Sequence, residues 1–328
     1  MSQLSWGVLE IDYEAEADHI AARIRELLTG VLRKRGLVVA ISGGIDSSTC
    51  VALAVRAIGN QRVQALILPE KDSSGDSAVR AMALAEFLEI PVLTVDIAPT
   101  LEAIGCYRWR DEAVRRAVPE FQDDWGMKIV IAGGLSGQIN HFRIVAQSPD
   151  GQRIERRLNL PDYLQIVAAT NFKQRIRKNL EYFHADRLNY AVVGTPNRLE
   201  YDQGFFVKNG DGSADLKPIA HLYKSQVYAM ARHLKLPQIV CDAQPTTDTY
   251  SLPQGQDEFY FALPYRSMDL ALWAHNHGVP AAELAKVLEV TEQQAARVFA
   301  DIEAKRRTSR YLHLAPQLIR PVGELDGD

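Results

Sequence analysis

The stretch that most limits how this chain can fold runs from residue 36 to residue 58. The run GLVVAIS (36–42) is almost wholly apolar, a Ser-Gly-Gly turn follows, and residues 46–58 have the length and composition of a helix. A strand without polar alternation is typical of a sheet that is covered on both faces. Strand-like runs at 63–69 and 91–97 flank another helical stretch at 77–90. Because strands and helices alternate, the sequence predicts an α/β fold with a doubly wound, mostly parallel sheet and flanking helices.

The remainder of the chain adds helices and one region of a different kind. Residues 190–195 have the pattern of a strand, the last third is mostly helical, and further helices are predicted at 15–34, 171–184 and 222–234. Residues 127–160 instead alternate apolar and polar side chains around Pro149-Asp150-Gly151, which predicts an inserted antiparallel β-ribbon. We expect one domain over 1–270, with an insertion at about 99–170, and a helical C-terminal region at 271–328 packed on the same domain.

The overall composition excludes several classes of protein. The net charge of −4 argues against a surface devoted to nucleic acid. No apolar run is long enough for a membrane helix, and the acidic N-terminal stretch lacks a signal-peptide pattern. Three widely spaced cysteines suit a reducing compartment and exclude a disulfide scaffold or a zinc site made only of cysteines. We therefore expect a cytoplasmic protein that binds neither a membrane nor nucleic acid.

The turn after the first strand has the features of an anion-binding loop. In a parallel sheet, ligands bind beyond the carboxyl ends of the strands, and the free N–H groups at the start of the next helix attract phosphate. Asp46 would repel phosphate unless a cation lies between them, and magnesium bound by carboxylates and phosphate oxygens meets this condition. The alternative is that Asp46 only caps the helix.

The string SGGxDS at 42–47 resembles the pyrophosphate loop of ATP pyrophosphatases that adenylate their substrates. Among these enzymes, the later motifs resemble those of the ammonia-dependent NAD synthetase family. They are NFKQRIRK (171–178), VVGTPNRLE (192–200), GFFVKNGDGSADLKPI (204–219), LYKSQV (222–227), PTTD (245–248) and QDEFYFALPYRSMD (256–269). The resemblance covers roughly 36–96 and 170–270, and the segment at 204–219 discriminates best between pyrophosphatase families.

This resemblance implies an activity and a set of site residues. Members of the family adenylate the carboxylate of nicotinic acid adenine dinucleotide with ATP, release pyrophosphate, and let ammonia displace AMP to give NAD. The positions matching the family's pyrophosphate loop are Ser42, Gly43, Gly44, Asp46, Ser47 and Ser48. Further ATP contacts match Thr195, Lys224 and Thr246, and the contacts to the acid match Arg175, Lys208, Asp215 and Lys305. The resemblance implies that Asp46 and Glu200 bind Mg²⁺ and that Asp46 and Lys224 serve catalysis.

Departures from the family pattern concern the acid substrate more than ATP. The segment Pro99–Thr170 is roughly forty residues longer than the family usually has, which is typical of a functional addition. Pro196-Asn197 follows the Gly-Thr pair, Ala304 replaces the histidine of a His-Lys-Arg triplet, and PTTDT (245–249) replaces PTADL. We expect the ribbon to cover or narrow the acid pocket, and we expect Phe205 and Phe206 to be core residues. Arg175 and Arg177 lie two positions apart, so we expect at least one of them to be structural or solvated.

Other interpretations remain open at the level of sequence. An amide-forming or adenylating relative could act on a different carboxylic acid. A tRNA-thiolating enzyme is disfavoured because no paired catalytic cysteines are visible. Residues 278–307 superficially resemble a helix-turn-helix, but their second helix is poor in base-reading side chains. No glutaminase domain is visible, so we expect ammonia to come free or from a separate glutaminase chain, and the resemblance implies a homodimer.

Overall fold

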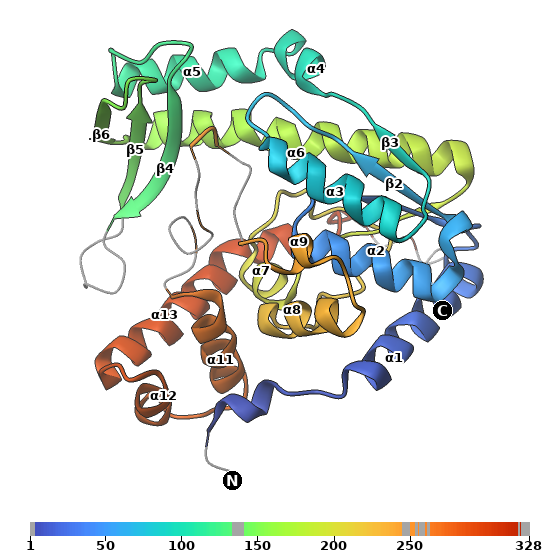
Figure 1. The fold of residues 1–328 in the computed structure, drawn as a ribbon. Coiled ribbons are helices and arrows are strands. Elements are labelled where there is room, and N and C mark those ends of the chain that lie inside the picture. Colours follow the sequence, from blue (N-terminus) through green and yellow to red (C-terminus); the bar gives the residue numbers. More distant parts are fainter. Residues whose placement is uncertain are drawn as a thin grey trace.

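A parallel sheet lies at the centre of the protein. A computed structural model describes residues 4–132, 141–244, 250–252, 255, 260, 263–320 and 322. The strands of the sheet are β1 (Leu37–Ala40), β2 (Val63–Ile67), β3 (Val92–Thr94) and β7 (Ala191–Val192). Their order is β3-β2-β1-β7, and every neighbouring pair is parallel (Figure 1). The predicted parallel sheet is therefore confirmed.

Helices cover both faces of this sheet. The first face packs against α1 (Tyr13–Glu26), η2 (Leu27–Val31), α2 (Ile45–Ile58), α3 (Gly75–Phe87), α8 (Lys224–His233) and α9 (Gln238–Cys241), and a short turn η3 (Asn60–Arg62) joins α2 to β2. The second face packs against α4 (Ala98–Ala103), α5 (Cys106–Ala117) and α6 (Leu160–Leu188). Within β1, Leu37 and Val39 belong to the first core and Val38 to the second. This burial on both sides explains why β1 is apolar throughout and makes the sheet doubly wound.

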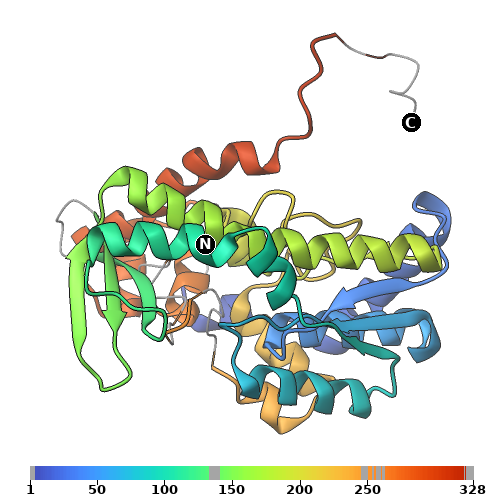
Figure 2. The same ribbon diagram turned by 90° about the horizontal axis from the view of Figure 1, so that it is seen from above.

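The insertion forms a small antiparallel sheet beside the first half of α6. Its strands are β4 (Gly126–Ala132), β5 (His141–Gln147) and β6 (Arg153–Arg157), in that order. The predicted ribbon is confirmed, with the turn at Gly151 between β5 and β6, and a third strand is present. Met127 and Ile144 pack against Val114 of α5 and Ile166 of α6, so the sheet shares a core with these helices (Figure 2).

The last third of the chain is helical, as expected. It contains α11 (Tyr265–Asn276), α12 (Ala281–Leu288), α13 (Glu292–Ser309) and η5 (Arg310–His313). These helices share a core with Leu199 of α7 (Arg198–Gln203) and with Leu4 and Leu9 at the start of the chain, where η1 (Trp6–Leu9) lies. No helix in the described parts of the chain combines the length and the apolar character needed to span a membrane.

Candidate active site

The Ser-Gly-Gly turn joins the end of β1 to α2 and is held in shape by its own side chains. The backbone N–H of Ser42 donates to Ser47 Oγ at 3.2 Å, and Ser48 Oγ donates to the carbonyl of Gly44 at 2.8 Å. Gly43 has a φ of +75°, and a Cβ added there would lie 2.3 Å from the carbonyl oxygen of Ser77 in α3. Only glycine fits this position, because both the backbone conformation and the approach of α3 exclude a side chain.

Asp46 lies in the first turn of α2 but does not cap it. The N-cap residue is Gly44, which makes no side-chain capping bond, so the first amide groups of α2 remain available to an anion. The Asp46 carboxylate instead forms an ion pair with Lys224 and accepts a hydrogen bond from Asn197 Nδ2 at 3.1 Å. The helix-cap interpretation of Asp46 is therefore wrong.

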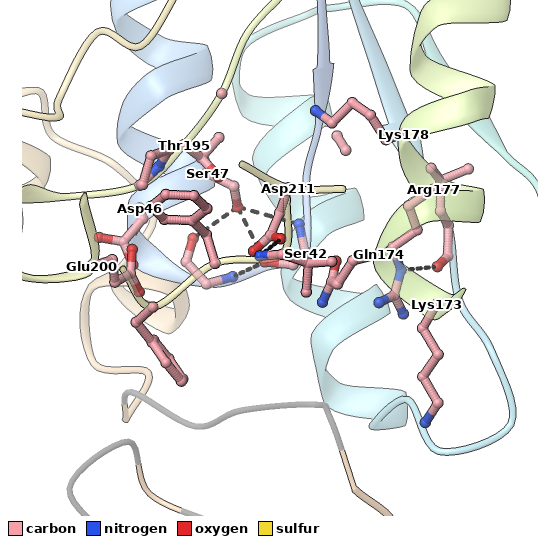
Figure 3. Close-up of a pocket in the computed structure, with 18 of the residues that line it drawn as sticks. Ser42, Asp46, Ser47, Lys173, Gln174, Arg177, Lys178, Thr195, Glu200 and Asp211 are labelled. Atoms are coloured by element: carbon pink, nitrogen blue, oxygen red, sulfur yellow. Dashed lines mark hydrogen bonds between the residues drawn. The ribbon is translucent and has the colours of Figure 1, made fainter. Parts of the chain in front are cut away.

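Glu200 brings a second carboxylate to the same place. Asn197 caps α7 by accepting bonds from the N–H groups of Leu199 and Glu200, and Glu200 Oε2 accepts a bond from the N–H of Asn197 at 3.1 Å. Asn197 thus orients both acids, and Figure 3 shows Asp46 and Glu200 turned toward each other. Burial, followed by the negative charge of Asp46, raises the pKa of Glu200 to about 8.

Lys224 supplies the positive charge between these acids. Its side chain is only 3% exposed and extends from the start of α8. Burial alone would lower the pKa of its ammonium group, but Asp46 and Glu200 outweigh burial and raise it. The N-terminus of α8 is fixed by Asp269, whose carboxyl accepts bonds from the N–H groups of Lys224 at 3.1 Å and Ser225 at 2.7 Å. Burial raises the pKa of Asp269 to about 7.

The two carboxylates fit a divalent cation. Among the described residues no group of three or more histidine, cysteine or acidic side chains could hold a metal by itself. Asp46 and Glu200 face the same cavity, and burial followed by the charge of Asp46 raises the pKa of Glu200. Two protein carboxylates completed by phosphate oxygens and water are the usual environment of Mg²⁺.

A cavity of about 720 Å³ opens in front of the loop. The predicted residues that line it are Ser42, Gly44, Asp46, Ser47, Thr195, Glu200, Lys224, Arg175, Lys208 and Lys305. Gly43, Ser48 and Asp215 do not line it, and Thr246 lies outside the described residues. Asp215 instead accepts a bond from the N–H of Val192 at 2.7 Å and so supports β7. Its contact with the acid stays a prediction.

Several cavity residues were not predicted. They include Arg80 of α3. They also include Asp211, and Lys173, Gln174, Arg177 and Lys178 of α6 (Figure 3). Lys173, Arg177 and Lys178 lie within the helix predicted at 171–184, but the predicted range alone does not reveal which side of the helix lines a cavity. Arg177 donates to the carbonyl of Leu68 at 3.1 Å and Arg175 to that of Lys208 at 3.4 Å, so both line the cavity while holding neighbouring backbone. Phe205 and Phe206 line it as well. Phe205 also packs against the core of the C-terminal helices, as expected, whereas the assignment of Phe206 to a core is corrected.

The C-terminal helices close the cavity on the side of the predicted acid site. Lys305 and Thr308 of α13 line it, and Lys208 Nζ donates to the carbonyls of Tyr311 and Leu314 at 2.8 and 3.2 Å. Arg306 pairs with Asp202 at 2.7 Å rather than standing free. Lys305 also pairs with Asp301 at 2.6 Å, so two of the basic side chains near the end of α13 have acidic partners within the protein.

The chain is similar in sequence and in fold to known NAD synthetases. A family model described as NAD synthase matches residues 18–120 and 149–310. The "NH(3)-dependent NAD(+) synthetase" of Rhizobium meliloti (strain 1021) is 55% identical over 323 residues, which cover 98% of this chain and 96% of that protein. Among solved structures, the NMN synthetase of Francisella tularensis has a TM-score of 0.66 at 22% identity, with 95% of this chain and 100% of that chain covered. The NH3-dependent NAD synthetase of Campylobacter jejuni has a TM-score of 0.62 at 20% identity, with 94% and 100% covered. At these identities the two structures support the fold alone.

Proposed function

This chain belongs to the NAD synthase family, and we propose that it converts nicotinic acid adenine dinucleotide, ATP and ammonia into NAD, AMP and pyrophosphate. The observation that carries this proposal is the SGGxDS loop at the carboxyl end of β1, facing Lys224 and two carboxylates across one cavity. A relative named as an ammonia-dependent NAD synthetase is identical at 55% of positions over nearly the whole chain.

We propose the following roles for the residues around ATP. The amide groups at the start of α2 and the hydroxyls of Ser42 and Ser47 bind the pyrophosphate that leaves, with Gly43, Gly44 and Ser48 shaping the loop. Lys224 neutralises negative charge on the phosphates as the carboxylate oxygen of the acid attacks the α-phosphorus. Thr195 and Thr246 complete the ATP site. Ammonia then attacks the carbonyl carbon of the acyl-adenylate, and AMP leaves.

We propose that the acid substrate lies against the cations between α6 and α13. Arg175, Lys208 and Lys305 line that side of the cavity, together with Arg177. Their positive charges are complementary to the negatively charged pyrophosphate and carboxylate groups of a dinucleotide acid. Asp215 does not line the cavity, so its proposed contribution to the acid site is indirect: it accepts a hydrogen bond from the N–H of Val192 and so positions β7.

Turnover of defined acids tests this function. We expect stoichiometric AMP, pyrophosphate and NAD from nicotinic acid adenine dinucleotide with ATP, magnesium and ammonium, because the loop is of the pyrophosphatase type. Products can be separated by chromatography, with other carboxylic acids as the comparison set. Formation of ADP and phosphate would overturn the reaction type, whereas AMP formation with another acid alone would keep the chemistry and change the substrate.

We propose that Mg²⁺ binds between Asp46 and Glu200, where it would neutralise the phosphates of ATP. In the metal-free protein, the raised pKa of Glu200 means that stability falls as the pH rises from about 4.5 to about 8, since the folded state holds the proton more tightly. We expect Glu200→Gln to reduce this fall, and we expect Mg²⁺ to raise the melting temperature at pH 8.5 only in the wild-type protein. Thermal unfolding measures both effects. Equal stabilisation of the variant by Mg²⁺ would contradict the assignment.

We also propose that the protein acts as a homodimer and takes ammonia either free or from a separate glutaminase chain. The use of ammonia is supported by the relative from Rhizobium meliloti, which is named for its dependence on NH3, and the homodimer is carried over from the family resemblance. Light scattering on an active preparation tests the first point, and a mass of about 36.6 kDa would contradict it. Activity with ammonium alone tests the second.

A further inference from the structure

Two stacked aromatic rings form part of the cavity wall far from the phosphate loop. Phe142 of β5 lies on Tyr163 of α6, with ring centroids 3.8 Å apart and an angle of 13° between the ring planes. Both residues line the same cavity as Ser42, Lys173 and Arg175. Each side chain is only partly buried, so ring surface remains open beyond the pair itself.

The position of the pair along α6 separates it from the groups that bind ATP. Lys173 pairs with Glu70 and Asp72 in the loop after β2, and this contact places Lys173 near the carboxyl ends of the parallel strands. Tyr163 precedes Lys173 by ten residues, which corresponds to about 15 Å along the helix. Val167, Thr170 and Asn171 line the cavity between them, so the wall is continuous.

One member of the pair, Phe142, belongs to a part of the chain that the general family model does not cover. The family model leaves residues 121–148 unmatched, and Phe142 lies in that gap. The relative from Rhizobium meliloti nevertheless aligns over 98% of this chain. The insertion therefore brings to the cavity an aromatic surface that the general family model does not include.

We propose that Phe142 and Tyr163 bind the second, distant aromatic ring of a dinucleotide acid and so select dinucleotides over mononucleotides. The inference rests on the proposed function, because it assumes that the reacting carboxylate lies beside Asp46 and Lys224. A dinucleotide has two rings joined through a pyrophosphate. When the reacting ring lies near the loop and the pyrophosphate lies against Arg175 and its neighbours, the other ring extends along α6 toward the pair. An open aromatic face suits stacking of a planar heterocycle.

The test compares nicotinic acid adenine dinucleotide with nicotinic acid mononucleotide as substrates of the full-length protein. We expect Phe142→Leu, which keeps an apolar side chain but removes the ring, to raise KM for the dinucleotide about tenfold, since stacking on an aromatic side chain contributes about 1.4 kcal/mol. KM for ATP and kcat/KM for the mononucleotide should change less than twofold. Phe142→Tyr should restore the wild-type preference, because it restores the ring.

A matched control separates stacking from a general loss of structure. Phe183→Leu alters another phenylalanine on α6, whose side chain is 59% exposed outside the cavity, and should leave all kinetic constants unchanged. Equal losses for both acids, or a raised KM for ATP, in Phe142→Leu would overturn the proposal. If the wild-type protein uses neither acid but adenylates another, the proposed function fails first, and this result is distinct from failure of the ring pair.

Discussion

Asp46→Asn should lower kcat for AMP formation at least a hundredfold while the protein stays folded. The variant keeps the shape of the side chain and its bond to Asn197, but it removes the negative charge that pairs with Lys224 and that we assign to Mg²⁺. Loss of one preorganised electrostatic partner in an active site typically costs about 10²–10³ in kcat, and Asp46 contributes to two such partnerships. Quenched-flow or steady-state measurement of AMP provides the readout.

Asp76→Asn is a suitable control for this prediction. Asp76 lies in the first turn of α3, as Asp46 does in α2, but it is exposed and does not line the cavity. It should retain wild-type activity. If Asp46→Asn keeps kcat within threefold of the wild type and shows the same dependence on Mg²⁺, Asp46 has no role in catalysis.

The central sheet could be predicted because its signal is local. β1 and β2 are buried on both faces, so nearly every residue in them is apolar, and a Gly-rich turn follows β1 directly. Helix α5 was missed because its buried face carries Arg110 and Asp111, and a buried polar face breaks the apolar periodicity that marks a helix. The early start of α6 had a signal, since Asn159 caps the helix and Pro161 follows in its first turn.

The candidate site depended on contacts that no local pattern reveals. Lys224 and Asp46 are 178 positions apart, and Asn197 reaches Asp46 across 151 positions. The family resemblance predicted Lys224 as a site residue, whereas Asn197 was noted only as a difference from the family's sequence pattern. Its spacing to Glu200 does match a capping box, which could have predicted that Asn197 orients this acid. The partnership of Phe142 with Tyr163 required knowledge of how the insertion packs on α6.

A buried ionic network links the insertion to the main sheet and makes the second prediction with a large effect. Arg110 of α5 pairs with Asp72 at 2.5 Å and with Asp111 at 2.7 Å. Lys173 pairs with the same Asp72 at 2.6 Å and with Glu70 at 3.0 Å. The side chains of Arg110, Asp72 and Lys173 are at most 6% exposed, so each charge depends on its partners rather than on water.

Arg110→Met should lower the free energy of unfolding by about 3–5 kcal/mol, the usual cost of removing one partner from a buried ion pair. The substitution keeps an apolar stem of similar length but leaves Asp111 without its cation and Asp72 with Lys173 alone. Urea unfolding followed by circular dichroism measures the change. Because Lys173 and then Arg110 counteract burial and lower the pKa of Asp72, the stability that this carboxylate contributes is present above pH 3.8 and is lost at lower pH, and the loss should be smaller in the variant.

Arg108→Met is the matched control on the same helix. Its side chain is 65% exposed, and its ion pair with Glu112 spans 3.9 Å, so the cost should stay below about 1 kcal/mol. A similar loss in both variants would show that α5 is sensitive to any substitution. An unchanged free energy of unfolding in Arg110→Met would contradict the prediction, and would mean that water or a rearrangement stabilises the carboxylates of Asp72 and Asp111 in place of Arg110. The expected difference between the two arginines follows from burial. An exposed ion pair contributes little to the free energy of unfolding, because water solvates both charges. Removing one charge from a buried network is costly, because it leaves the opposite charge buried without a partner.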